Sequence, residues 1–241
     1  MFELIRNGII GYDSHIAIFI LGIVACVVVP YLLGSLNFAV IISKSRYKDD
    51  VRTHGSGNAG ATNMLRTHGK SAALLTLLGD LLKAVVSVLL ALFLMPGDGF
   101  AYIAGLCCML GHAFPIYYGF KGGKGVVVAA GTMLVLNPLV FLTCIGVWAF
   151  VIIFTKYVSL AAIIAAVLFP LLNFFWFVKD YICYASGEFV QYAFPLRTIF
   201  SVIMGVLIIW LHRENIVRLV KGTENKLGGK KKTENIRNKL K

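Results

Sequence analysis

Residues 15–43 read HIAIFILGIVACVVVPYLLGSLNFAVIIS and carry no formally charged side chain. A helix needs about 20 apolar residues to cross the hydrocarbon core of a bilayer, and this stretch is long enough to do so. The whole composition agrees, since 59% of the 241 residues are hydrophobic and only 14% are charged. A water-soluble domain of this size cannot hide so much apolar surface, so lipid must be the solvent.

Further apolar stretches follow along the chain. Asn137-Pro138 divides the longest of them, because proline cannot donate to a helix ladder and disfavours helix in the residue before it. The predicted spans are residues 15–43, 71–95, 100–120, 126–136, 139–155, 157–178 and 192–211. Backbone groups in lipid must be satisfied internally, so we expect an all-α polytopic bundle of about seven transmembrane helices. The fourth span is short for a crossing, and a re-entrant hairpin is its alternative.

The distribution of charge predicts the orientation. An odd number of crossings puts the two termini on opposite sides. Nearly all of the 23 Lys and Arg residues fall on the side of the carboxyl terminus, and the exceptions are Arg6, Lys83, Lys179 and Arg197. The positive-inside rule then places the amino terminus outside and the carboxyl terminus in the cytoplasm. We expect one membrane domain over residues 1–225, followed by a basic, disordered tail over residues 226–241.

Three polar segments interrupt the apolar pattern, and all three fall on the predicted cytoplasmic side. The first, residues 55–63, is called the glycine-rich loop below, and Arg52 precedes it. Closely spaced glycines let several backbone amides point at one anion, and a following helix amino terminus strengthens such a site; the alternative is a flexible loop. We expect phosphate to be bound here by Gly55, Ser56, Gly57, Asn58, Gly60, Thr62 and Asn63.

The second segment, residues 120–125, reads FKGGKG and is called the lysine turn. It ends the third span and begins the fourth, and two lysines on a glycine turn before a helix also suit phosphate. The predicted ligands are Lys121, Gly122, Gly123 and Lys124, although the sequence is not a Walker P-loop. His112 lies upstream, where a packing role and a functional role are equally open.

The third segment leaves the last span. His212, Asn215 and Arg218 are spaced by three, so they can share one helical face. The alternative is an ordinary interfacial cap with cytoplasmic charges.

Two features lie within the spans. Ser35 can serve the reaction or simply bond a backbone carbonyl of its own helix. Asp80 and Lys83 are one helical turn apart, and ionisable groups are costly in a membrane, so both a functional role and plain charge pairing are open. No Cys/His spacing predicts a metal, and we expect neither a metal nor another cofactor.

These segments resemble the acyl-phosphate-dependent glycerol-3-phosphate acyltransferases, the PlsY family of bacterial membrane enzymes, over most of the chain. The family's first motif resembles Gly34-Ser35 with the later Arg52, and its second resembles the glycine-rich loop. The lysine turn with His112 also matches, and the third motif matches at His212, Asn215 and Glu224. The family often has proline where this chain has Asn37.

The resemblance implies an acyltransferase of phospholipid biosynthesis in the bacterial inner membrane, with its active site facing the cytoplasm. An acyl phosphate would give its acyl group to glycerol 3-phosphate, forming lysophosphatidate and phosphate. The implied catalytic residues are Ser35, Arg52, His212 and Asn215, and the implied structural residue is Glu224. The proton acceptor is either His212 or the substrate's phosphate.

The expected partners are the two substrates and membrane lipid, with no nucleic acid; no protein partner is predicted. An acyl-serine on Ser35 is disfavoured, because no Ser-His-Asp pattern is visible. The HxxxxD signature of the other large class of glycerolipid acyltransferases is absent. A transporter for phosphorylated metabolites is the alternative function, but its site is expected near the bilayer midplane, between inverted repeats. A non-enzymatic scaffold would leave the three polar segments without a purpose.

Overall fold

The structure is a computed structural model that describes residues 12–95, 98–185 and 194–228. Within these residues every regular element is helical. The α-helices are α2 (Tyr12–Ser35), α3 (Phe38–Tyr47), α4 (Ala61–Thr67), α5 (Lys70–Leu94), α6 (Asp98–Ala113), α7 (Val126–Leu136), α8 (Pro138–Thr155), α9 (Val158–Ala185), α10 (Phe194–Leu211) and α11 (Arg213–Val220). Two short 3₁₀ turns, η1 (Val51–Thr53) and η2 (Ile116–Tyr118), lie between them. The predicted all-α class is confirmed.

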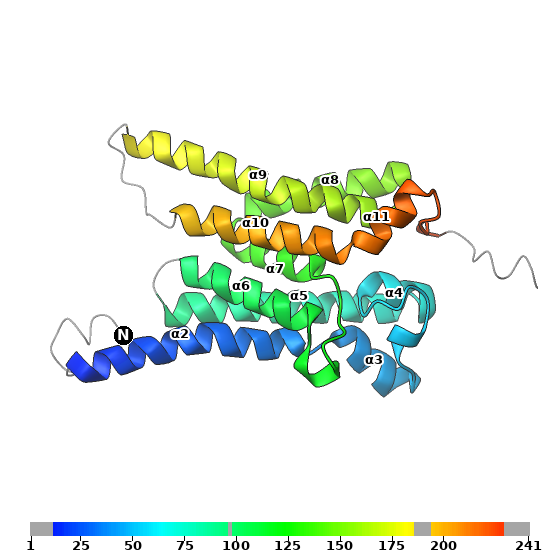
Figure 1. The fold of residues 1–241 in the computed structure, drawn as a ribbon, viewed down its shortest axis with the longest axis horizontal. Helices are drawn as coiled ribbons and strands as arrows, with labels where there is room; N and C mark the ends of the chain where they lie inside the picture. Colours follow the sequence, from blue (N-terminus) through cyan, green and yellow to red (C-terminus); the bar gives the residue numbers. More distant parts are fainter. Residues whose placement is uncertain (1–11, 96–97, 186–193, 229–241) are drawn as a thin grey trace, which may run out of the picture.

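The long helices run roughly alongside one another and form two groups (Figure 1). Helices α2, α5 and α6 pack together on one side, and α8, α9 and α10 pack together on the other. Helix α7 contacts α5, α6 and α8, and α6 also contacts α10, so these two helices join the groups. Successive long helices cross back and forth, which returns the polar connections to the same end.

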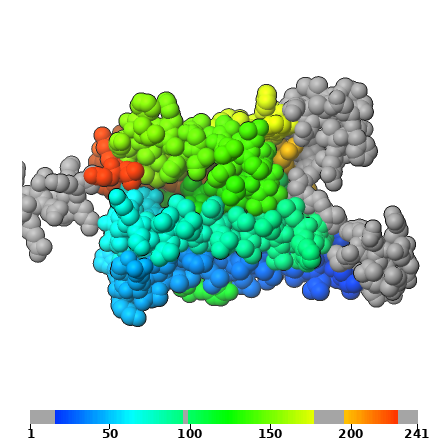
Figure 2. Space-filling model, turned by 180° about the vertical axis from the view of Figure 1, so that it is seen from behind, coloured from blue at the N-terminus to red at the C-terminus, as the bar shows by residue number. Residues whose placement is uncertain are grey.

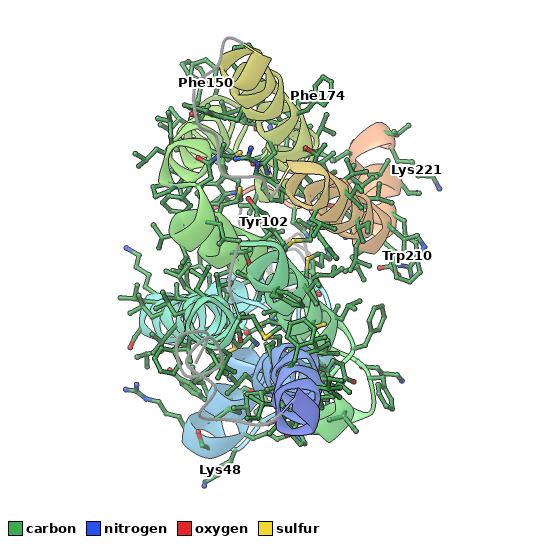
Figure 3. The ribbon with its side chains drawn as sticks, turned by 90° about the vertical axis from the view of Figure 1, so that its left-hand side faces the viewer. Lys48, Tyr102, Phe150, Phe174, Trp210 and Lys221 are labelled. Carbon is green, nitrogen blue, oxygen red and sulfur yellow. The ribbon has the colours of Figure 1, made fainter. Side chains whose placement is uncertain are left out.

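The apolar surface faces outward, as a bundle in lipid requires. Phe150 and Phe174 lie at the periphery, whereas Tyr102 lies in the interior (Figure 3). Lys48 and Lys221 also point outward in the same view. The interior is packed largely with small residues and Met, including Ala84, Ala129 and Met109. Close approach of helices through small side chains is typical of membrane proteins.

The first predicted helix, residues 15–43, is broken in the structure. α2 ends at Ser35 and α3 begins at Phe38. Asn37 caps α3, because its Oδ1 accepts from Val40 N at 3.1 Å, and its Nδ2 donates to Ala59 O at 3.2 Å. The family's proline is therefore not needed for a break here, and Asn37 adds a bond to the glycine-rich loop.

The other spans follow the predicted order with shifted ends. α7 matches the predicted 126–136 helix, and Asn137 caps α8 through Val140 N, with Pro138 in the first turn. The third predicted helix ends early, at Ala113, because Pro115 follows. Five described helices meet the length and hydropathy of a span, or six with the bent pair α10–α11, while α7 is shorter. Part of the seventh predicted span (residues 192–193) and most of the predicted tail (residues 229–241) lie outside the described residues.

Candidate active site

The three predicted polar segments gather at one end of the bundle, called the loop end. The connections from α3 to α5, from α6 to α7 and from α10 to the last described residues all lie there (Figure 1). Seen from behind, the α4 region adjoins the carboxyl-terminal segment at that end (Figure 2). Arg66 bridges these two, since its Nη2 donates to Asn225 O at 3.3 Å. The segments thus form one surface, away from the middle of the bundle where a transporter site is expected.

The glycine-rich loop is held in shape by Asn63. The Asn63 Oδ1 accepts from Ser56 N at 3.0 Å, and its Nδ2 donates to Val51 O and His54 O, both at 3.0 Å. Gly55 and Gly57 have φ values of 61° and 70°, the left-handed region that glycine adopts without strain. A Cβ on Gly55 would lie 2.2 Å from Asn63 Oδ1. The loop therefore has a defined conformation, and both ends of the Asn63 side-chain amide are bonded to backbone groups of the loop and of the residues before it.

The remaining polar residues of this loop are more open. Gly55, Ser56 and Gly57 are exposed, and Asn58 and Gly60 are half-buried. The loop leads into α4, so Thr62 and Asn63 belong to a helix. Gly60 caps α4 without a side-chain hydrogen bond. The amides of Asn63 and Met64 both donate to Gly60 O at 3.0 Å, so phosphate binding at the start of this seven-residue helix stays a prediction.

Arg52 joins the start of this loop to the lysine turn. Its Nη1 donates to Tyr118 O at 2.8 Å and to Lys121 O at 3.1 Å. Its Nε and Nη2 donate to the two carboxylate oxygens of Asp50 at 2.9 and 2.8 Å. These bonds from Arg52 hold the pKa of Asp50 well below its usual range. Through these bonds the Arg52 guanidinium fixes the spacing between the glycine-rich loop and the lysine turn.

The lysine turn folds back onto the end of α6. Gly122 N donates to Ala113 O at 3.1 Å, and Gly123 N donates to His112 O at 3.0 Å. A Cβ on Gly123 would lie 2.1 Å from His112 Nε2 and 2.7 Å from Ala59 O. Gly123 is thus the point where the lysine turn touches the glycine-rich loop. Lys121 stays exposed, whereas Lys124 turns into the protein.

Lys124 leads to a buried polar cluster, called the Glu224 cluster. Lys124 Nζ donates to Asn215 Oδ1, and Asn215 Nδ2 donates to Glu224 Oε1 at 2.8 Å. Ser159 Oγ donates to the same oxygen at 3.1 Å, and Arg218 Nε donates to Oε2 at 2.7 Å. The cluster consists of Lys124, Ser159, Asn215, Arg218 and Glu224. Of the three residues predicted to share a helical face, Asn215 and Arg218 bond the same carboxylate, and His212 is the residue before α11.

Electrostatics in the Glu224 cluster favour an added anion. Burial opposes ionisation of Glu224, but bonds from Arg218 and Asn215 outweigh it and keep its pKa low. Burial lowers the pKa of Lys124 to about 8, with the charge of Arg218 acting in the same direction. Arg66 also acts on Lys124 through its charge. The three cations Lys124, Arg66 and Arg218 thus act on two carboxylates, the buried Glu224 and the exposed Glu214, which leaves one positive charge in excess.

His212 follows the last residue of α10 and is buried beside this cluster. Its Nδ1 lies 2.8 Å from Ile208 O; a carbonyl only accepts, so we assign the proton to Nδ1. Burial lowers the pKa of His212 to about 4, and the nearby charge of Lys124 adds to the effect. The imidazole is therefore neutral near pH 7, with the Nε2 lone pair left as an acceptor.

Ser35 lies at the end of α2 and is fully buried. Its Oγ donates to Tyr31 O at 2.9 Å and accepts from Ile116 N at 3.4 Å. The backbone bond foreseen as the plain alternative is therefore present. The same hydroxyl also joins the break after α2 to η2, which precedes the lysine turn.

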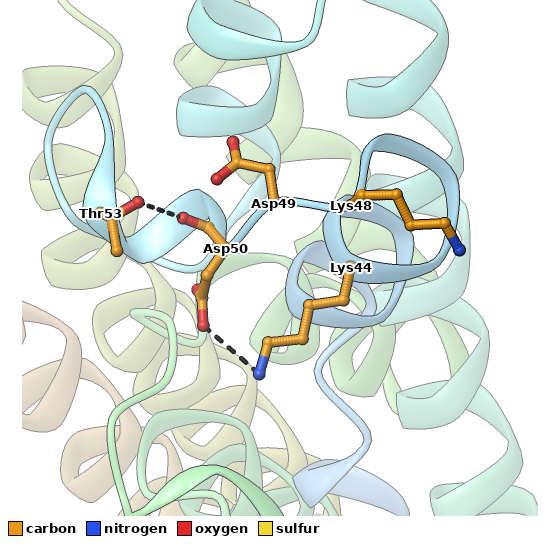
Figure 4. A pocket seen from close by; sticks show the side chains of 5 residues that line it. All are labelled: Lys44, Lys48, Asp49, Asp50 and Thr53. Carbon is orange, nitrogen blue, oxygen red and sulfur yellow. Dashed lines mark hydrogen bonds and ion pairs between the residues drawn. The ribbon is translucent and has the colours of Figure 1, made fainter.

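A surface hollow of about 440 Å³ lies beside the glycine-rich loop. It is lined by Lys44, Lys48, Asp49, Asp50 and Thr53 (Figure 4). Asp50 is paired there with Lys44 at 3.5 Å, and Asp49 is paired with His54 at 2.9 Å. Because its carboxylates offset its cations, the hollow lacks the excess positive charge of the Glu224 cluster. We therefore place the candidate phosphate site between the loops rather than in this hollow.

Several contacts of the site were not foreseen in the sequence. Ser159 is a single serine at the start of an apolar helix, and Arg66 looks like one more cytoplasmic charge. Their partners, Glu224 and Asn225, lie 65 and 159 positions away along the chain. No local pattern signals such pairs. Among the described residues, no group of His, Cys, Asp and Glu could hold a metal ion.

Comparison with known proteins identifies the family of this chain. The family model described as glycerol-3-phosphate acyltransferase matches residues 24–222. The glycerol-3-phosphate acyltransferase of Coxiella burnetii is 44% identical over 202 residues, covering 83% of this chain and 96% of that protein. Its counterpart in Halalkalibacterium halodurans is 44% identical over 210 residues, covering 86% and 96%, respectively.

A solved structure supports the same assignment. The crystal structure of PlsY, an integral membrane glycerol 3-phosphate acyltransferase in its glycerol 3-phosphate form, matches with a TM-score of 0.72. It is 34% identical and covers 85% of this chain and 95% of that one. The lysophosphatidic acid form of PlsY matches with a TM-score of 0.68. With the family model covering most of its length and close relatives aligned over nearly all of theirs, this chain belongs to the glycerol-3-phosphate acyltransferase family.

Proposed function

We propose that this chain transfers a fatty acyl group from an acyl phosphate to a hydroxyl of glycerol 3-phosphate. The new bond joins the acyl carbon to the glycerol oxygen, and the bond from that carbon to the phosphate oxygen breaks. The hydroxyl proton ends on the released phosphate. The products are inorganic phosphate and lysophosphatidate. Lysophosphatidate is the first acylated intermediate of phospholipid biosynthesis.

The excess positive charge between the loops is the observation that carries this proposal. Both substrates bear a phosphate, and the three cations Lys124, Arg66 and Arg218 outnumber the carboxylates of Glu224 and Glu214 that act on them. The glycine-rich loop and the lysine turn meet at Gly123 beside these cations. Cations and amides held in place before the reaction stabilise the charge that develops on a departing phosphate. Holding the two phosphates together lowers the barrier further through proximity.

His212 is proposed to orient the attacking hydroxyl. Its Nε2 lone pair can accept the hydroxyl hydrogen bond, because Nδ1 carries the proton. A group with a pKa of about 4 is a weak base at neutral pH. Even a phosphate monoester has a second pKa of about 6, so the released phosphate is the stronger base and is proposed to keep the proton.

For the other residues predicted to be catalytic, Arg52, Asn215 and Ser35, the contacts support positioning roles. Arg52 holds the two loops at a fixed spacing and adds charge beside them. Asn215 links Lys124 to Glu224 and so orients the lysine. Ser35 anchors η2 beside the lysine turn. We further propose that the loop end faces the cytoplasm of a bacterial inner membrane, because the basic residues concentrate there.

The direct test uses the purified chain in detergent with glycerol 3-phosphate and palmitoyl phosphate. We expect equal amounts of phosphate and lysophosphatidate, and Arg52→Ala and His212→Ala should each lower the rate by at least about 100-fold. Product formation that requires acyl-CoA or acyl carrier protein would exclude acyl phosphate as the donor. Unchanged turnover in both variants would exclude this site.

A further inference from the structure

An ionic cluster lies inside the bundle, apart from the proposed phosphate site. It consists of Asp80 and Lys83 of α5 and His112 of α6, all of them buried. Lys83 Nζ lies 2.8 Å from Asp80 Oδ1, and His112 Nδ1 lies 3.5 Å from the same oxygen. Charges within a membrane are costly, so their retention needs a reason beyond packing. The acyl transfer outlined above makes no use of them.

The hydrogen bonds of Lys83 are directed at the break after α2. Its Nζ donates to Gly34 O and to Leu36 O, both at 2.8 Å, and lies 3.0 Å from His112 Nδ1. The last carbonyls of a helix lack partners within the helix and attract a cation. Together with Asp80 Oδ1 at 2.8 Å, these acceptors share the three N–H groups of the ammonium. Asp80 therefore serves as the counter-charge, and Lys83 holds the break open on both sides of Ser35.

His112 carries this influence to the lysine turn. Because Nδ1 accepts from Lys83, we assign the ring proton to Nε2. That nitrogen lies against Gly123, where a Cβ would come within 2.1 Å, and His112 O accepts from Gly123 N. The position of Gly123 thus depends on a ring that Lys83 orients. One buried lysine therefore contacts the supports of both Ser35 and the lysine turn.

We propose that Lys83 is a positioning residue for the acyl transfer, holding the chain break at Ser35 and the Gly123 turn in register through two carbonyls and His112. The proposal rests on the acyltransferase function given above. Misplacing catalytic groups by about 1 Å can cost about 100-fold in rate. Loss of register should therefore lower kcat more than it changes KM for glycerol 3-phosphate.

The test replaces the ion pair without leaving a lone buried charge. Asp80→Asn with Lys83→Met removes both charges, and Asp80→Asn with Lys83→Gln keeps an amide that can donate to the two carbonyls. Ser87→Ala is the matched control, because Ser87 Oγ donates to Lys83 O at 2.7 Å one turn along the same helix. Each protein is purified in detergent, and its folded fraction, kcat, KM and backbone hydrogen exchange are measured.

For the Met variant we expect kcat per folded molecule to fall about 100-fold and KM to change by less than about threefold. Exchange should quicken in peptides covering residues 34–37 and 119–125. The Gln variant should lie between it and wild type, and Ser87→Ala should stay within about twofold of wild type. A merely structural role would lower the folded fraction while kcat per folded molecule stays at the wild-type value.

The proposal fails if the Met variant keeps wild-type kcat and exchange, or if Ser87→Ala reproduces its losses. If the Met variant does not fold, the Gln variant decides by the same two measurements. Wild-type protein that gives no product from glycerol 3-phosphate and palmitoyl phosphate would refute the proposed function. The exchange comparison would then still decide whether Lys83 orders the two segments.

Discussion

The glycine-rich loop and the Glu224 cluster are two anion-attracting regions built in opposite ways. The loop is shaped by its backbone conformation, and the amide oxygen and nitrogen of the Asn63 side chain both bond to nearby backbone groups. The Glu224 cluster is made of side chains from three distant segments, and it keeps positive charge in excess. The first region provides shape and the second provides charge, so the same kind of substitution should have different consequences in each.

Removing Glu224 should have the largest effect, because it is the common acceptor of the cluster. In Glu224→Ala, Asn215 Nδ2 and Ser159 Oγ lose their acceptor, and Arg218 keeps only its 3.9 Å pair with Glu214. We expect a loss of about 3 kcal/mol of stability and nearly all activity, since the cluster's cations lose their one buried counter-charge. Thermal unfolding in detergent measures the change in stability, and the acyl-transfer rate measures the change in activity.

Glu214 is the control for that experiment. It also pairs with Arg218, at 3.9 Å, but its side chain is 74% exposed, against 3% for Glu224. Exposed pairs contribute little, so Glu214→Ala should change stability by less than about 0.5 kcal/mol. Equal losses in the two variants would mean that burial does not set the strength of this cluster.

Lys124→Met tests charge without removing the acceptor. The apolar chain of methionine fills similar space, and Glu224 keeps its bonds to Arg218, Asn215 and Ser159. We expect kcat/KM to fall about 100-fold while the folded fraction stays high, because a donor to the transition state is lost. Lys70→Met changes an exposed lysine at the same end and should leave kcat/KM unchanged within about twofold. A matching loss there would indicate a general effect of charge.

Asn63→Ala tests shape without touching a charge. It removes three bonds that hold the glycine-rich loop and leaves buried groups unpaired. We expect the loosened loop to weaken substrate binding by about 2 kcal/mol. This should raise KM for glycerol 3-phosphate roughly 30-fold, with a smaller change in kcat. Thr53→Ala removes one exposed bond to Asp50 O and should leave KM near the wild-type value. A fall in kcat at constant KM would place the loop's role in the reaction step instead.

The same division explains what could be predicted from the sequence. Helices were predictable wherever local chemistry decides them: apolar length set α5, and Asn137-Pro138 set the boundary between α7 and α8. The break after Ser35 was missed: its cap Asn37 is local, but the cation that bonds Gly34 O and Leu36 O comes from another helix. The sequence around Ser35 could not indicate this contact, because Lys83 lies 49 positions away from Gly34 along the chain.

The site followed the same rule. Glycine spacing predicted an anion-binding loop, which stays a prediction, and the spacing of His212, Asn215 and Arg218 predicted a shared face, of which Asn215 and Arg218 bond one carboxylate. The partners Ser159 and Arg66 could not be predicted, because only the fold brings them to Glu224 and Asn225. For Asp80 and Lys83, plain pairing was one of two open interpretations, and the pair is present at 2.8 Å. Its additional bonds to the α2 break were not foreseen.

The smallest predicted effect is on pH dependence, and it separates charge from shape most directly. Because burial lowers the pKa of Lys124 to about 8, the cation is present below that pH and lost above it. We expect kcat/KM for glycerol 3-phosphate to fall roughly tenfold between pH 7 and pH 9, as the protonated fraction of the free enzyme falls. Initial rates at low substrate concentration across this range measure it.

Loss of folded protein caused by deprotonation of Lys124 cannot explain such a fall in kcat/KM. Above pH 8 the unfolded chain, with an ordinary lysine pKa, binds more protons than the folded chain, so this group makes folding more favourable as pH rises. Lys124→Arg supplies the decisive comparison, because a guanidinium stays charged through pH 10. Its kcat/KM should be lower than wild type at pH 7 but flat to pH 9. If the variant retains the wild-type decline, the titrating group lies elsewhere, and the charge attributed to the Glu224 cluster is not what binds the substrate.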